Sequence, residues 1–137
     1  LHGIQFGLPA MNDPDELMFE VAAIKMLTGP TLNPGWFGHP ATTTIYVLAI
    51  THVLVLAGGW LGGWFPTVSA LADMVYANPG VVILPARFVM ALFGAACVFM
   101  TWRLGRELLG VRAGLTAAAL LALSPVHIAW SQVIRSD

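Results

Sequence analysis

The chain of 137 residues is 58% hydrophobic and only 9% charged, and its mean hydropathy is +0.79. Soluble domains carry about 25% charged residues, so this composition indicates a bilayer rather than water as the main solvent. A formal net charge of −1, without a basic patch that could neutralise phosphates along a duplex, argues against a nucleic-acid partner. The single cysteine, Cys97, excludes an intrachain disulfide. Because the sequence starts at Leu1 and stops at Asp137 directly after an apolar run, we expect a fragment of a longer protein.

The first predicted element contains an acidic cluster in the stretch "NDPDELMFE". Asp13, Asp15, Glu16 and Glu20 are four of the seven acidic residues in the whole chain. The cluster has two interpretations, a helix start and a functional site. For the first, Asp13 is a suitable N-cap, a proline follows at the first helical position and Glu16 occupies the capping-box position.

These capping residues predict a helix from about 14 to 28, and the Gly-Pro pair after it is typical of a helix end. Such a helix would be about 21 Å long, which is too short for a hydrocarbon core of about 30 Å. We therefore expect it to lie at the membrane interface, half embedded among headgroups or covered by other helices.

The next predicted elements are a loop and a long uncharged segment. The Pro, Gly and Asn content of 31–40 indicates a loop, and its Trp and Phe are typical of a membrane boundary. Residues 41–60 are long enough to span a bilayer, but four threonines and His52 favour a re-entrant or interfacial helix over a membrane helix. A short helix is expected at 67–77.

Two membrane helices, about 86–104 and 112–131, are predicted in the last part of the chain. Pro125 should kink the second of them. The connector between them carries Arg103, Arg106 and Arg112, which predicts a cytoplasmic loop by the positive-inside rule. The chain end then emerges on the outer side. If 41–60 does not span, the acidic cluster faces the same outer compartment.

The ordered set of motifs resembles a known family. "NDPDELMFEVAAIKMLTGPTLNPGWFGHP" is similar to a first outer loop with a Pro-Asp-Glu motif and a later His-Pro, and "PARFVMALFGAACVFMTWRLGRELLGVRAGLTAAALLALSPVHIAWSQVIRSD" is similar to the two membrane helices that follow. The family is the GT-C class of polyprenyl-phosphate-sugar-dependent glycosyltransferases, which includes protein O-mannosyltransferases and the aminoarabinose transferases of lipid A. The single pieces are weak signals, whereas their order is fairly specific.

This resemblance implies an all-α, polytopic membrane helical bundle that lacks its first spanning helix. Residues 1–80 would form the first outer loop, and 81–137 the two membrane helices up to the second outer loop. The implied activity is transfer of a hexose or pentose from a polyprenyl-phosphate donor to a protein, lipid or glycan acceptor. The expected location is a bacterial or archaeal plasma membrane, with the site facing outward.

The resemblance also implies the site residues. Asp15 is the candidate general base, and Glu16 is its candidate catalytic neighbour. An acceptor hydroxyl or amine must lose a proton as it attacks the anomeric carbon, and a carboxylate within hydrogen-bond reach can take it. Arg87, in an apolar helix, suits the lipid phosphate of the donor, with snorkelling to the headgroups as the alternative. His39 is a candidate substrate contact.

Arg135 and Asp137 complete the expected substrate-binding set. Asp137 matches the acid at the start of the second outer loop, and its alternative role is a solvated pair with Arg135. No cofactor is certain. A divalent cation shared by Asp15 and Asp137 is left open, because two carboxylates are few ligands for such an ion.

A non-enzymatic interpretation competes with the glycosyltransferase. The chain would then be part of a transporter or scaffold protein, and its acidic cluster only a helix cap. A transporter should place ionisable residues at mid-membrane depth in broken helices, whereas this sequence keeps them near segment ends.

Overall fold

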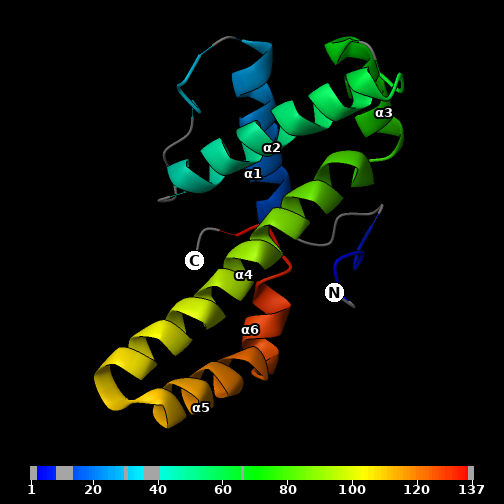
Figure 1. Ribbon diagram of the computed structural model, residues 1–137. Coiled ribbons are helices and arrows are strands. Elements are labelled where there is room, and N and C mark those ends of the chain that lie inside the picture. Colours follow the sequence, from blue (N-terminus) through cyan, green and yellow to red (C-terminus); the bar gives the residue numbers. More distant parts are fainter. Residues whose placement is uncertain (1–2, 9–13, 30, 36–40, 66, 136–137) are drawn as a thin grey trace.

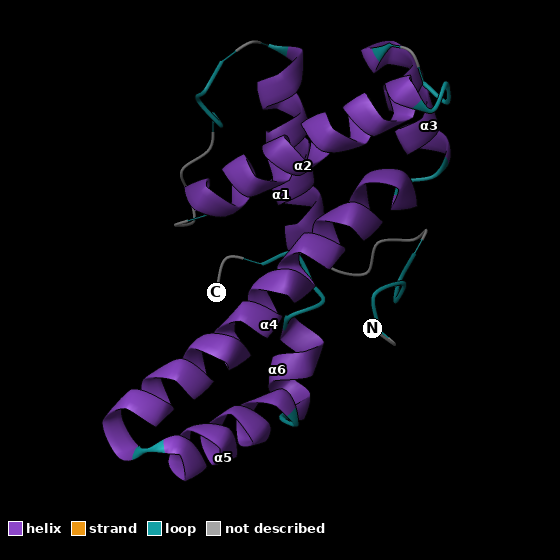
Figure 2. Ribbon diagram, in the orientation of Figure 1, coloured by secondary structure: helices purple, strands orange, loops and turns teal. Residues whose placement is uncertain are grey.

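The computed structural model describes residues 3–8, 14–29, 31–35, 41–65 and 67–135. All regular structure in these ranges is helical (Figures 1 and 2). The elements are α1 (Pro14–Thr28), α2 (Thr42–Leu61), α3 (Val68–Ala77), α4 (Gly80–Leu109), α5 (Val111–Ala122) and α6 (Pro125–Trp130). The predicted all-α class is therefore confirmed.

Helix α1 occupies the residues that the capping pattern predicts. Its acidic first turn and basic last turn both complement the helix dipole. Phe19, Ala22, Ala23 and Met26 are buried at helical spacing, and α1 packs mainly against α2 through this face. Two acids, Glu16 and Glu20, lie buried along the same side, and this departs from an ordinary apolar face.

Helix α2 buries Ile45, Leu48, Ala49 and His52 along one side, against α1 and α4. At 20 residues it is about 30 Å long, which equals the thickness of a hydrocarbon core. By length and composition α2 and α4 both qualify as membrane spans. The interfacial or re-entrant placement of 41–60 stays a prediction.

Helix α4 connects the two halves of the structure. It has 30 residues, so it is about 45 Å long, and Pro85 lies inside it. Its first half is covered by α2 and α3, and its second half runs antiparallel to α5 (Figure 1). Many large apolar side chains on the α4–α5 hairpin are exposed, among them Phe93, Phe99 and Leu120. Such a surface suits lipid or further helices rather than water.

Glycines allow α4 and α5 to pack with their backbones in close approach. A Cβ atom on Gly114 would lie 2.6 Å from the Arg106 amide nitrogen, and one on Gly105 would lie 2.8 Å from Gly114 Cα. Gly110 forms the turn with φ of 93°, a conformation that L side chains rarely adopt. Small residues at helix crossings are a feature of membrane helix packing.

The segment predicted as one kinked helix at 112–131 is divided into α5 and α6. Pro125 is at the start of α6, and the Ser124 side chain accepts a hydrogen bond from the His127 amide, so the sequence restarts a helix here instead of bending one. His127 Nε2 lies 3.2 Å from the Gly94 carbonyl oxygen and holds α6 against the middle of α4. Whether 112–131 crosses a membrane stays a prediction.

Candidate active site

The first turn of α1 contains a buried ion pair with Arg87 of α4. Glu16 is 0% exposed and Arg87 is 3% exposed. Arg87 Nε donates to Glu16 Oε1 at 2.8 Å, and Nη2 donates to Oε2 at 2.6 Å. This parallel, bidentate geometry is the strongest form of an Arg–carboxylate contact. It fixes the start of α1 to the first half of α4.

The remaining donors of Arg87 hold the segment 3–8. Its Nη1 donates to the carbonyl oxygens of Ile4 at 2.8 Å and Phe6 at 2.7 Å. A buried guanidinium is tolerated only when its charge and donors are satisfied, and these contacts satisfy all three nitrogens. A lipid phosphate would have to compete with Glu16 and with two carbonyls to reach Arg87.

Glu16 also holds the C-terminal segment of the described chain. Its Oε1 accepts a hydrogen bond of 3.0 Å from the backbone amide of Ile134, which is itself 0% exposed. Nearby, the Gly3 amide donates to Gln132 Oε1 at 3.1 Å. The start of α1, Arg87 of α4 and residues 132–134 therefore meet in one place, which we call the junction (Figure 1).

Asp15 and Arg135 lie on the more exposed rim of this junction. Arg135 Nη2 is 3.7 Å from Asp15 Oδ2, and their side chains are 27% and 42% exposed. The Arg135 guanidinium carbon lies 4.5 Å from the centroid of the Trp130 ring, a cation–π distance. The junction thus presents a carboxylate beside a guanidinium, at a helix N-terminus.

Four of the six predicted site residues converge here: Asp15, Glu16, Arg87 and Arg135. His39 and Asp137 lie outside the described residues, as does the predicted N-cap Asp13. Within the described part of the chain no group of three or more His, Cys, Asp or Glu could hold a metal ion. The divalent-cation hypothesis, which needs Asp137, stays a prediction.

Sequence reasoning missed a second buried polar pair, between Glu20 of α1 and His52 of α2. His52 Nε2 lies 2.6 Å from Glu20 Oε2, with both side chains almost fully buried. The His52 Nδ1 contacts the Leu48 carbonyl, so Nδ1 must carry the proton that it donates. The spacing of Glu16 and Glu20 places both acids on one face of the helix, but nothing in the sequence identifies His52 as the partner of Glu20.

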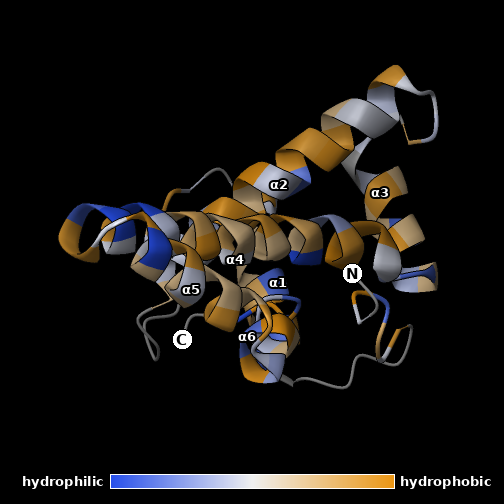
Figure 3. Cartoon of the chain, turned by 60° about the horizontal axis from the view of Figure 1, so that its bottom comes forward, coloured by the Kyte–Doolittle hydropathy of each residue, from blue (hydrophilic) through white to orange (hydrophobic). Residues whose placement is uncertain are grey.

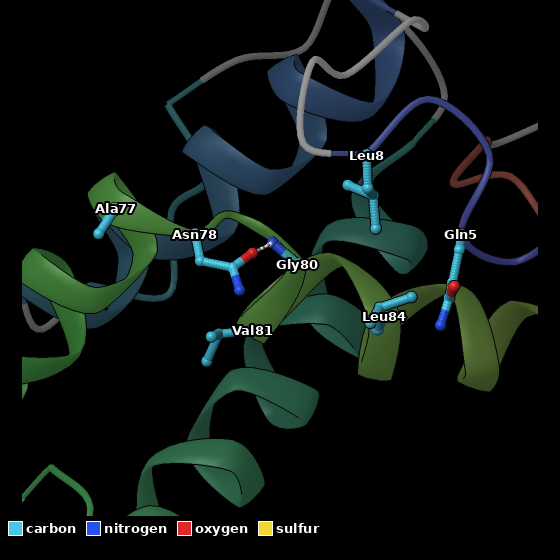
Figure 4. A pocket seen from close by; sticks show the side chains of 7 residues that line it. All are labelled: Gln5, Leu8, Ala77, Asn78, Gly80, Val81 and Leu84. Atoms are coloured by element: carbon cyan, nitrogen blue, oxygen red, sulfur yellow. Dashed lines mark hydrogen bonds between the residues drawn. The ribbon is translucent and has the colours of Figure 1, made fainter.

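Two hollows elsewhere on the structure contain none of the charged residues of the junction. One, of about 360 Å³, is formed by α1 to α4 and is almost entirely apolar, with His52 as its main polar member. The other, of about 580 Å³, is an open depression between segment 3–8 and the α3–α4 junction, with Gln5 and Asn78 as its polar members (Figure 4). Asn78 is occupied there, because its Oδ1 accepts from the Gly80 amide.

Comparison with known proteins gives one family. The family model described as dolichyl-phosphate-mannose-protein mannosyltransferase matches residues 65–137, which is more than half of the chain. No curated protein and no solved structure matches the chain. The matched range covers α3 to α6 and includes Arg87 and Arg135, whereas α1 and its acids precede it.

Proposed function

The chain belongs to the dolichyl-phosphate-mannose-protein mannosyltransferase family, and we propose that it forms part of an outward-facing site that transfers mannose from a polyprenyl-phosphate donor. The family and the two long apolar helices make it a membrane glycosyltransferase of the mannosyltransferase type. The same match favours an enzyme over the transporter or scaffold alternative. The donor, the side of the membrane and the residue roles below are proposed.

Asp15 is the proposed general base. The acceptor hydroxyl oxygen attacks the anomeric carbon, the bond from that carbon to the phosphate oxygen breaks, and the hydroxyl proton passes to the Asp15 carboxylate. Asp15 suits this role because its side chain is 42% exposed and can meet a substrate. Glu16 is fully buried and both of its oxygens accept hydrogen bonds, so we assign it the positioning of Asp15.

Arg135 is the proposed partner of the departing lipid phosphate. Its guanidinium lies 3.7 Å from Asp15, so the group that takes the proton and the group that stabilises the leaving group would flank one reacting centre. Stacking on Trp130 limits its rotamers. This assignment replaces Arg87 as the phosphate ligand, since Arg87 is already saturated by Glu16 and two carbonyls.

A lipid-linked donor is consistent with the apolar cavity. Its volume of about 360 Å³ is lined by apolar side chains of all four of the first helices, among them Leu27, Leu56 and Val75. An isoprenoid chain presents only hydrocarbon to such walls, and burial of apolar area contributes about 25 cal/mol per Å². The outer location rests on the three arginines of the α4–α5 connector, which the positive-inside rule places in the cytoplasm, at the other end of α4.

The observation that carries the proposal is the meeting of Asp15 and Arg135, which are far apart in sequence, at a junction fixed by buried bonds. The test uses the full-length enzyme in membranes with radiolabelled polyprenyl-phosphate mannose, and measures label transferred to protein and lipid acceptors. Asp15→Asn should lower transfer by about 10²- to 10⁴-fold, the usual contribution of a general base, without lowering the amount of enzyme.

Asp73→Asn is the matched control, because Asp73 is an exposed acid on α3. It should transfer mannose at the unsubstituted rate. Arg135→Gln should raise the donor KM and lower kcat, and Arg135→Lys should recover part of the loss because it keeps the charge. Full transfer by Asp15→Asn would reject Asp15 as the base, and transfer of a different lipid-linked sugar in place of mannose would correct the donor.

A further inference from the structure

Half of the basic residues of the chain gather at the α4–α5 connector. Arg103, Arg106 and Arg112 are exposed there, out of six Lys and Arg in all. The one acid among them, Glu107, accepts a hydrogen bond of 3.2 Å from Arg103. Figure 3 shows this end of the hairpin as its most hydrophilic part, beside apolar helix surface. Two positive charges of the connector therefore have no acid beside them in the connector sequence.

If α4 enters the hydrocarbon core at Gly80, its length carries these arginines to headgroup depth. From Gly80 to Trp102 the helix rises about 34 Å, enough to cross a hydrocarbon core of about 30 Å. The last seven residues, which begin at Arg103, add about 10 Å more. This is the layer in which lipid phosphates lie.

A small groove next to the connector has the polarity order of a phospholipid. It has a volume of about 270 Å³ and is lined by Phe99, Met100, Leu104, Arg103 and Glu107. The apolar members Phe99, Met100 and Leu104 are each more than half exposed, at 52%, 62% and 58%. The apolar residues of the groove lie mainly earlier on α4, and its charged residues lie toward the end of the helix. A phospholipid with its acyl chain along the apolar residues would therefore place its headgroup beside the charged ones.

Aromatic stacking restricts a second arginine at the same place. The Arg106 guanidinium carbon is 5.5 Å from the Trp102 ring centroid, and Trp102 in turn lies 5.5 Å from the Phe99 ring. Stacking uses the face of the guanidinium, whereas phosphate oxygens bind its N–H edge. The two contacts are compatible, and the stack lowers the entropy lost when an anion binds.

We propose that the α4–α5 connector is a binding site for an anionic glycerophospholipid. Arg103 and Arg106, with Arg112 at the start of α5, bind the headgroup phosphate, and one acyl chain lies along Phe99, Met100 and Leu104. The site is separate from the sugar-transfer site, because Arg103 is about 24 Å along α4 from Arg87. The inference does not depend on the proposed reaction.

The test measures lipid retention by the full-length protein in nanodiscs of phosphatidylcholine doped with phosphatidylglycerol. Competition with a fluorescent phosphatidylglycerol, or native mass spectrometry after mild delipidation, gives the relative affinity. Each arginine near an anionic surface contributes about fivefold, so the triple substitution to Gln should lower phosphatidylglycerol retention by about 100-fold. Lys25→Gln, which removes an exposed cation from α1, is the matched control and should leave retention unchanged.

A gain-of-binding variant makes the test independent of folding defects. Glu107→Gln removes the acid that competes for Arg103 and should raise phosphatidylglycerol affinity by about fivefold. The proposal is overturned if the triple variant retains phosphatidylglycerol as well as the unsubstituted protein, or if phosphatidylcholine binds equally tightly. Preference for polyprenyl phosphate over phosphatidylglycerol at this site would also overturn it, since the ligand would then be the donor lipid.

Discussion

Glu16→Gln is the sharpest test of the junction that holds Asp15. The substitution keeps the size of the side chain but removes its charge and replaces one acceptor oxygen by an NH₂ group. Arg87 would then be a buried cation with an amide N–H pointing at one of its own donors, where it now has bonds of 2.6 and 2.8 Å to a carboxylate. Removing one partner of a buried ion pair costs about 3–5 kcal/mol.

That loss raises the population of molecules in which the bonds of the junction are broken by about 10²- to 10⁴-fold. The measurement is hydrogen–deuterium exchange of the peptide containing Ile134, in the full-length protein in nanodiscs. The Ile134 amide donates to Glu16 at 3.0 Å, and a hydrogen bond to a charged group contributes about 1.5–3 kcal/mol. Its protection should fall by at least about tenfold even if the rest of the junction holds.

A double substitution separates the lost pair from a general defect. Replacing Arg87 by Met in the Glu16→Gln background removes the unpaired cation, so part of the protection at Ile134 should return. Wild-type protection in Glu16→Gln would refute the assignment of Glu16 as the centre of the junction. Equal exchange in the single and double variants would refute the coupling to Arg87.

Two further substitutions test the packing around the site. Gly114→Ala places a methyl group 2.6 Å from the Arg106 amide nitrogen, so it should lower the free energy of unfolding by about 1–3 kcal/mol. Gly58→Ala meets nothing within 4 Å and should be neutral or stabilising. Both are measured by unfolding in mixed micelles, and equal effects would argue against the tight α4–α5 contact. His52→Leu leaves the buried Glu20 carboxylate without its imidazole partner and should lower the free energy of unfolding by about 1–3 kcal/mol. Adding Glu20→Leu to the same protein should restore most of that loss. A double variant no more stable than His52→Leu alone would show that the pair is not coupled.

The local signals in the sequence predicted α1 well. Capping residues act on their own helix, so the proline and acids of the first turn were sufficient to place Pro14–Thr28. The same kind of signal was misread at Ser124 and Pro125, where a cap residue followed by a first-turn proline marks a new helix rather than a kink.

The partners of the buried charges could not be predicted in this way. Periodicity shows that Arg87 lies in an apolar helix and must either snorkel or meet an anion, but it does not identify that anion. In the structure the anion is Glu16, 71 residues earlier, whereas the family resemblance implies a lipid phosphate. The Glu20–His52 pair was equally out of reach, because each residue alone is compatible with an exposed or a hydrogen-bonded position.

The hydrogen bond from Ile134 to Glu16 has a consequence for synthesis in the cell. It joins residues 118 positions apart, so at about 5–20 residues per second the first partner waits roughly 6–24 s for the second to be made. Until then α1 has been translated, but the Glu16 carboxylate lacks the hydrogen bond from the Ile134 amide. A ribosome that stalls within α5 would leave a nascent chain that contains Asp15 but not yet Arg135, so the proposed sugar-transfer pair could not form.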